Sequence, residues 1–186
     1  MITETSRPDW LLPSIDDLTE FPIVQIAQQL SRICRYAGAT PHFFSVARHS
    51  LLVAELVPHD PALRLAALVH DAHECWTGDV LRPAKQKIGS ALDALTRPYD
   101  DKLHALLGLD LSIADRAIVQ MADDAACQLE LAWLGKSLYE INTARPGKRS
   151  QNAHLEPMGF DTDIEDRDEW IRNVSKCRES MIERAA

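Results

Sequence analysis

The sequence predicts an all-α fold, a single-domain helical bundle, from three observations. Apolar residues recur at the spacing of amphipathic helices over most of the chain. No stretch of useful length alternates apolar and polar residues, as a half-buried strand would. A chain of 186 residues, of which 46% are hydrophobic, is long enough to bury one substantial core. We therefore expect one domain over residues 1–186, with its core over about 20–137.

The first helices are indicated by apolar periodicity and by residues that start or stop helices. Residues 23–37 have apolar side chains at i, i+3, i+4 and i+7, and Gly38 would end that helix. A second helix is expected over about 42–57. Asp60, followed by a proline, is typical of a helix start, and it predicts a third helix over about 61–76.

The second half of the chain shows the same kind of pattern, interrupted by one polar stretch. Pro98 should kink or break the helix in which it lies. Residues 141–162 are polar, contain Pro and Gly, and predict a long surface loop. Helices are expected to start near Val80, to run from Ser90 to about Leu107 and from Ser112 to about Lys136, and to close the chain over about 163–183.

Charge and composition exclude several classes of partner. Lys and Arg number 20 against 28 Asp and Glu, a net charge of −8 without a basic stripe, so a nucleic-acid polymer is not the expected partner. No apolar run reaches the roughly 20 residues that span a bilayer, and the first ten residues lack a secretory signal pattern. A cytoplasmic protein is expected. The four cysteines, far apart and without a CxxC pair, predict neither a zinc knuckle nor disulfides.

The segment ALRLAALVHDAHEC, residues 62–75, is apolar around nearly the whole helix, which is typical of a buried helix. His70, Asp71 and Glu74 lie within it, and on an ideal helix they fall within an arc of roughly 100°. Buried carboxylates without partners are costly, so this group should be paired or bound to metal. A His–Asp hydrogen bond without metal is the alternative. His73 should point away from Asp71 by the same geometry.

A carboxylate from the helix over 112–136 can join this group. Its predicted apolar face is formed by Ile118, Ala122, Ala125, Leu129 and Trp133. Asp123 lies on the shoulder of that face, whereas Asp124 points away from it into solvent. Glu130 lies within about 20° of Asp123 in projection. Asp123 is therefore the predicted inward carboxylate.

His49 shares a helix face with Val46, Leu52, Val53 and Leu56, so it should also point inward. A lone inward histidine is more often a core residue that makes a hydrogen bond. With His70, Asp71 and Asp123, it instead gives two imidazoles and two carboxylates from three helices. Such a set suits one divalent cation of Mn, Co, Fe or Zn.

The order His49, His70-Asp71, Asp123 resembles the signature of the HD superfamily, helical phosphohydrolases that act on phosphate esters. The stretch HDAHECWTGDVLRPAK is similar to bacterial 5′-deoxynucleotidases and to phage dATP triphosphohydrolases. The resemblance covers about residues 20–135. It implies an HD-type bundle, often a homo-oligomer, that cuts the bond between the α-phosphorus and O5′ of a nucleotide and releases a deoxynucleoside.

Two acidic residues gain expected catalytic roles from this resemblance. A bound cation lowers the pKa of water toward neutrality, and Glu74, one turn from His70, would orient or deprotonate that water. Asp79 would be a second catalytic or sugar-contacting carboxylate, or else only a cap of the next helix. Further metal ions could enter with the substrate.

The phosphates need cations, and several side chains are candidates. Arg35 and Tyr36 match an Arg-aromatic pair that contacts phosphate and sugar in the deoxynucleotidases, although those enzymes have Trp in place of Tyr and one more residue before the histidine. Lys85 matches the lysine of their Pro-x-Lys motif. Arg48 and Arg82 are weaker candidates whose extra charge suits a triphosphate. Arg35 and Lys85 could instead be plain surface charges.

The sequence leaves three readings open. The first is a deoxynucleotide phosphohydrolase, acting on a monophosphate or a triphosphate. The second is an HD hydrolase of another phosphoester, such as an alarmone or a cyclic nucleotide. The third is a non-catalytic HD module that senses a nucleotide.

Overall fold

The computed structural model describes residue 8, residues 10–143 and residues 163–185, and it confirms the all-α prediction. The described residues form no β-strand, only an isolated antiparallel bridge between Cys34 and Ser45. In chain order the elements are the 3-10 helix η2 (Ile15–Asp17), α1 (Ile23–Leu30), the 3-10 helix η3 (Arg35–Gly38), α2 (Val46–Leu56), α3 (Pro61–Val69), α4 (Glu74–Thr77), α5 (Arg82–Ile88), α6 (Ser90–Leu107), α7 (Ile113–Thr143) and α8 (Asp163–Ala185).

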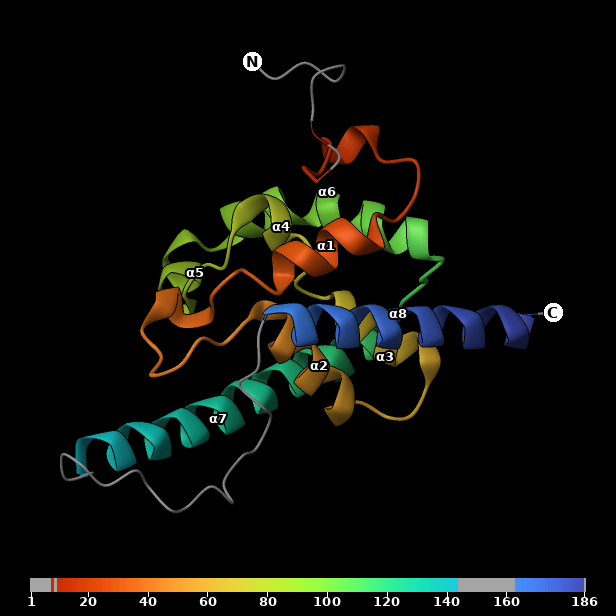
Figure 1. Cartoon of the computed structure of the whole chain (residues 1–186). Coiled ribbons are helices and arrows are strands. Elements are labelled where there is room, and N and C mark those ends of the chain that lie inside the picture. The colour runs from red at the N-terminus through yellow and green to blue at the C-terminus, as the bar shows by residue number, and fades with distance from the viewer. Residues whose placement is uncertain (1–7, 9, 144–162, 186) are drawn as a thin grey trace.

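The C-terminal helix α8 crosses the middle of the molecule, packed against α1, α2 and α3, while α7 packs against α2 and α3 (Figure 1). Trp170 of α8 is fully buried. Its Nε1 donates a hydrogen bond to the Leu68 carbonyl at 2.9 Å, and its ring stacks on Phe21 with centroids 6.4 Å apart. The core therefore extends into α8, beyond the expected range of about 20–137.

The first predicted helix is too long, because the backbone of its second half makes hydrogen bonds with a later segment instead of continuing the helix. Helix α1 ends at Leu30, and Val46 N–H donates to the Ile33 carbonyl while Arg35 N–H donates to the Phe44 carbonyl. These bonds fold the segment back onto the start of α2. Tyr36 and Ala37 then adopt left-handed backbone angles, with φ of 56° and 51°. Because non-glycine residues seldom adopt such angles, this turn is a local strain held by its surroundings.

Side-chain caps fix the starts of α2 and α3. Ser45 Oγ accepts a hydrogen bond from the Arg48 N–H, so α2 begins at Val46 rather than near residue 42. Asp60 Oδ1 accepts from the N–H groups of Ala62 and Leu63, which confirms the predicted start of α3. Each cap satisfies backbone donors that a helix start would otherwise leave unpaired.

The third predicted helix is not continuous, since α3 ends at Val69 and α4 begins at Glu74. Between them the chain winds more tightly: the N–H groups of Ala72 and Glu74 donate to the carbonyls three residues earlier. Such 3-10 turns place side chains at i and i+3 above one another. Asp71, His73 and Glu74 lie close together here, with one ligand atom of each within 4.8 Å of the others.

Helix α6 has its predicted bounds, whereas α7 and α8 end later than predicted. Helix α6 continues through Pro98, and α7 runs to Thr143, so residues 141–143 are helical rather than part of a loop. Residues 144–162 of that predicted loop lie outside the described part. Ser112 starts α7 as expected, since it exchanges hydrogen bonds with Asp115. The C-terminal half of α7 extends beyond the other helices (Figure 1). No helix in the described ranges is long and apolar enough to cross a membrane.

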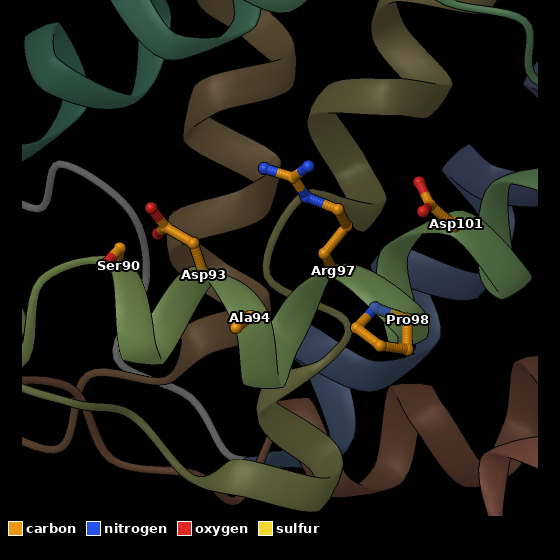
Figure 2. A pocket seen from close by; sticks show the side chains of 6 residues that line it. All are labelled: Ser90, Asp93, Ala94, Arg97, Pro98 and Asp101. Atoms are coloured by element: carbon orange, nitrogen blue, oxygen red, sulfur yellow. The ribbon is translucent and has the colours of Figure 1, made fainter.

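A hollow of about 340 Å³ lies along α6, and Figure 2 shows the side chains that line it. All of them belong to this helix: Ser90, Asp93, Ala94, Arg97, Pro98 and Asp101. None is a predicted site residue. The candidate site is therefore a cluster of buried side chains elsewhere, between α2, α3 and α7.

Candidate metal centre

The four predicted metal ligands lie together, although they come from three distant parts of the chain. His49 projects from α2, His70 and Asp71 follow the last turn of α3, and Asp123 projects from α7. His49 Nε2 lies 3.0 Å from Asp123 Oδ1 and 3.7 Å from Asp71 Oδ2. His70 Nε2 lies 3.2 Å from Asp71 Oδ2 and 4.0 Å from Asp123 Oδ1. Two imidazoles thus face two carboxylates across a few ångströms.

The other nitrogen of each imidazole is already used. His70 Nδ1 donates to the Ala67 carbonyl at 2.8 Å, and His49 Nδ1 is bonded to Glu130 Oε1 at 2.6 Å. Both Nε2 atoms are buried, and neither has a hydrogen-bond partner of suitable geometry in the described part of the chain. Metal-binding histidines typically keep one nitrogen for the metal and bond the other to a carbonyl or carboxylate. The same side chains could hold a metal ion or form the buried His–Asp pairs that were the alternative.

The spacing of these side chains is that of two overlapping groups that could hold a cation, both of which contain His49. Two ligand atoms about 2.1 Å from one ion lie about 3.0 Å apart at a right angle and about 3.4 Å apart at a tetrahedral angle. The observed separations of 3.0, 3.2, 3.7 and 4.0 Å lie near these values. His49, His70 and Asp71 form a group in which the ligand atoms are all within 4.8 Å of one another.

The electrostatics keep both carboxylates ionised. Burial acts against ionisation of Asp71, but His70, His49 and Lys85 outweigh it and hold the pKa of its carboxyl well below the usual range. Burial likewise opposes the ionisation of Asp123, yet the two imidazoles lower its pKa to about 2. For His70, the nearby carboxylates outweigh burial and raise the pKa to about 9. Without metal, His70 therefore carries the positive charge that a cation would supply.

Glu130 is a residue of this centre that the sequence did not assign. Its fully buried carboxylate bonds His49 Nδ1 through Oε1, while its Oε2 accepts from the Tyr36 hydroxyl at 2.7 Å and lies 3.2 Å from Arg35 Nη2. Arg35 Nη1 also lies 3.7 Å from Asp71 Oδ2. The strained turn at Tyr36 and Ala37 thus positions two side chains that hold Glu130. The sequence feature that could have identified Glu130 was its position close to Asp123 in helical projection.

Arg35 and Tyr36, the predicted phosphate and sugar contacts, lie beside the cluster and contact its carboxylates. The Arg35 guanidinium is almost buried, and its terminal nitrogens face Asp71, Glu130 and the Cys127 sulfur. Its charge is therefore already balanced by the carboxylates of the centre. It is not the solvated surface charge that was the alternative.

Glu74 lies on the other side of the centre, with one free oxygen. Its Oε1 accepts from Lys85 Nζ at 3.3 Å, while the buried Oε2 has no partner among the described residues. Burial, then the charges of Asp71 and Asp79, raise the pKa of Glu74 to about 9, against the opposing effect of Lys85. Asp79 itself does not cap α5, whose N-cap is Leu81 without a side-chain hydrogen bond. The capping alternative for Asp79 is therefore wrong.

His73 does not point away from this region, as the ideal-helix projection had predicted. Its Nδ1 pairs with Asp100 Oδ1 of α6 at 3.0 Å. A ligand atom of His73 also lies within 4.8 Å of carboxylate oxygens of Asp71 and Glu74. Residues 70–73 form turns rather than a regular α-helix, so the ideal-helix projection does not hold there.

The remaining predicted phosphate contacts divide into two groups. Lys85 and Arg82 are partly exposed; Lys85 bonds Glu74, and Arg82 Nη2 bonds Asp124 Oδ1 at 2.7 Å. Asp124 is exposed, as predicted. Arg48 instead pairs with Asp166 and Glu169 of α8, at 2.5 and 3.5 Å. A substrate contact by Arg48 stays a prediction.

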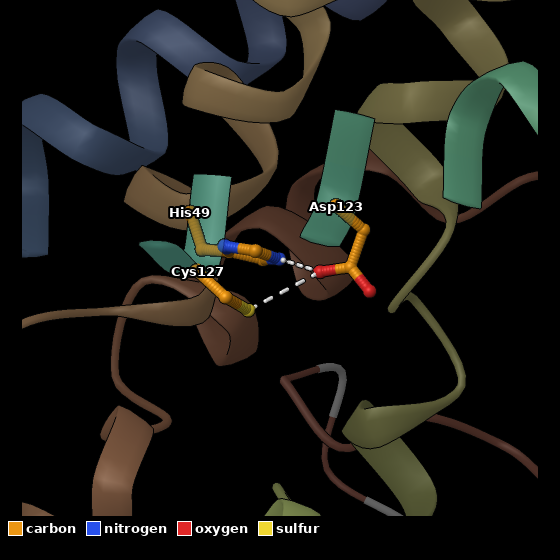
Figure 3. A group of neighbouring side chains, drawn as sticks. All are labelled: His49, Asp123 and Cys127. Atoms are coloured by element: carbon orange, nitrogen blue, oxygen red, sulfur yellow. Dashed lines mark hydrogen bonds and ion pairs between the residues drawn. The ribbon is translucent and has the colours of Figure 1, made fainter. Parts of the chain in front are cut away.

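Cys127 lies one helical turn after Asp123, next to the same group (Figure 3). Its Sγ donates to Asp123 Oδ1 at 3.6 Å and accepts from Arg35 Nη2 at 3.3 Å. Burial, and secondly Asp123, raise the pKa of this thiol to about 11. The sequence had indicated only a small, partly buried residue here, and the half-buried position agrees with that.

Comparison with known proteins identifies relatives but no activity. No family model matches the chain. The uncharacterized protein YfdR of Escherichia coli K12 is 47% identical over 64 residues, which are 34% of this chain and 35% of YfdR. The uncharacterized protein RCAP_rcc00048 of Rhodobacter capsulatus is 35% identical over 133 residues, 67% of this chain and 66% of that protein. The chain thus spans about a third of the length of one relative and about two thirds of the other.

Proposed function

We propose that this protein is a metal-dependent phosphohydrolase of the HD superfamily that releases a deoxynucleoside from a deoxynucleotide. One observation carries the proposal: the buried Nε2 atoms of two imidazoles lie 3.0–4.0 Å from the carboxylate oxygens of Asp71 and Asp123. His49, His70, Asp71 and Asp123 would hold one divalent ion of Mn, Co, Fe or Zn. That ion would lower the pKa of water toward neutrality and offset the charge of the phosphate.

Glu74 would accept the proton of the attacking water. Its free Oε2 can receive that proton, while Lys85 holds its Oε1. The water oxygen would form a bond to the α-phosphorus, the bond to O5′ would break, and the released deoxynucleoside would take up a proton at O5′. Charge neutralisation at Asp71 would remove one cause of the raised pKa of Glu74 and so favour its proton-accepting form.

The exposed cations next to the centre support a phosphorylated substrate. Arg82 and Lys85 both lie on α5 and reach toward the cluster through Asp124 and Glu74, respectively. The Arg82–Asp124 pair is exposed, and exposed ion pairs contribute little, so an incoming phosphate can compete for Arg82. Lys85 is itself 38% exposed, although its partner Glu74 is buried, so a phosphate can reach it from solvent. We propose Arg82 and Lys85 as phosphate contacts and Asp79 as a sugar or phosphate-side carboxylate. Assembly as a homo-oligomer remains a prediction from the resemblance.

The test combines metal analysis with a panel of substrates. The purified protein is incubated with Mn²⁺ or Co²⁺ and each dNMP and dNTP, and the products are identified. Inorganic phosphate indicates a monophosphate substrate, whereas triphosphate indicates a dNTP substrate. Ribonucleotides, an alarmone and a cyclic nucleotide complete the panel, because turnover of one of these alone would identify another HD activity.

Variants connect the activity to the centre. His70→Ala should lose both bound metal and turnover, and Glu74→Gln should keep the metal and lose rate. His59→Ala is the matched control, since His59 is exposed and bonded to Arg64 at the surface. Metal-free protein after exposure to every cation would reject the proposal. A nucleotide that raises the melting temperature of the protein but is never consumed would indicate a nucleotide-sensing module instead of an enzyme.

A further inference from the structure

The proposed function gives no role to Cys127, although its thiol lies against the candidate metal centre. Figure 3 shows the side chains of Cys127, His49 and Asp123 gathered around one point. One ligand atom from each lies within 4.8 Å of the others. Cys127 and Asp123 are four residues apart on α7, so the helix itself places the sulfur beside the carboxylate.

The distances have the values expected for ligands of one ion. A thiolate lies about 2.3 Å from zinc and a carboxylate oxygen about 2.1 Å, so a tetrahedral angle separates the two atoms by about 3.6 Å. Cys127 Sγ and Asp123 Oδ1 are 3.6 Å apart. Independently of the cysteine, His49 Nε2 is fully buried without a hydrogen-bond partner, 3.0 Å from the same Asp123 oxygen.

We propose that Cys127 is a further ligand of the cation, bound through its sulfur alongside His49 and Asp123. The inference rests on the metal centre of the proposed function. On binding, the S–H bond breaks, the proton leaves to solvent and a sulfur lone pair forms the bond to the metal, without oxidation or reduction. Arg35 Nη2, at 3.3 Å, and Arg82 Nη2, at 3.9 Å, offset the negative charge of the thiolate.

A sulfur ligand changes which cations the centre prefers. Thiolates favour Zn²⁺, Fe²⁺ and Co²⁺, whereas Mg²⁺ and Ca²⁺ prefer oxygen ligands. The centre should therefore select the first three ions over Mg²⁺. The same preference should weaken when serine replaces the cysteine, because a hydroxyl is a poor substitute for a thiolate.

Cobalt tests the sulfur bond directly. The full chain is loaded with Co²⁺, and its absorption is recorded in the near ultraviolet, where thiolate-to-cobalt charge transfer gives an intense band. The wild-type protein should show this band. Cys127→Ser should lose it while still binding cobalt. Cys75→Ser is the matched control and should keep it, since Cys75 Sγ faces the Ile26 carbonyl instead.

Cobalt bound to the wild type without the band, or a band that survives in Cys127→Ser, would overturn the inference. If Cys127→Ser does not fold, as judged by circular dichroism, the test is made on the wild-type protein alone. Zn²⁺ must then protect one thiol of the wild type from a disulfide reagent. A cobalt–sulfur band without nucleotide turnover would uphold the ligand and reject the phosphohydrolase. Turnover with cobalt but without the band would support the phosphohydrolase and reject Cys127 as a ligand.

Discussion

Replacing Glu130 with glutamine tests whether this carboxylate holds His49 for the metal. The substitution keeps the shape of the side chain and removes the charge that faces His49 Nδ1 at 2.6 Å. Hydrogen bonds to charged groups contribute about 1.5–3 kcal/mol, and those between neutral groups about 0.5–1.5 kcal/mol. The difference, about 1–1.5 kcal/mol, corresponds to roughly tenfold. Since orienting partners of metal ligands typically contribute 10–100-fold, Glu130→Gln should weaken metal binding by about tenfold or more.

The measurement is a competition between the protein and a chelator for Zn²⁺ or Co²⁺. Asp124→Asn is the control on the same helix, because Asp124 is exposed and pairs with the exposed Arg82. Arg35 keeps Asp71 as a partner in Glu130→Gln, and urea unfolding of the metal-free variant checks that it folds. A folded Glu130→Gln variant with wild-type metal affinity would refute the orienting role of this carboxylate.

Three further predictions concern stability. Because the pKa of His70 is raised from 6.5 to about 9, its stabilising contribution in the metal-free protein is complete below pH 6.5 and is lost as the pH rises through 9. Urea unfolding should show that the free energy of unfolding falls as the pH rises across that range. The fall should be smaller in His70→Gln, and an equal fall in the variant would contradict the prediction. Trp170→Ala should lower the free energy of unfolding by about 3–5 kcal/mol, whereas Trp10→Ala, at a side chain that is 66% exposed, should change it by less than about 0.5 kcal/mol. Asp60→Ala should reduce it by about 0.5–2 kcal/mol, and an unchanged urea midpoint would show that the cap does not stabilise α3.

The sequence predicted the helical class and most helices, because periodicity and caps are local signals. Asp60 and Ser112 start helices as expected. The errors arise where backbone contacts between distant residues compete with local propensity. The bridge between Cys34 and Ser45 ends the helical run early, and no periodicity over residues 23–37 announces it.

The residues of the candidate site were also predicted only in part. The inward positions of His49, Asp71 and Asp123 followed from helix faces, and the structure brings these side chains together. On α7 the predicted apolar face was rotated, since Leu129 is about half-exposed and Glu130 is buried. Hydropathy alone places a glutamate outside, and only its partners on other helices make its burial favourable.

Helix α7 supplies Asp123, Cys127 and Glu130 at intervals of four and three residues, so one rigid rod sets the spacing of three groups around His49. A residue inserted between Asp123 and Glu130 would rotate one against the other by about 100° and separate the carboxylate from the imidazole that it holds. An insertion before Ser112 would leave that spacing intact. Insertions and deletions should therefore be tolerated ahead of α7, but not between Asp123 and Glu130.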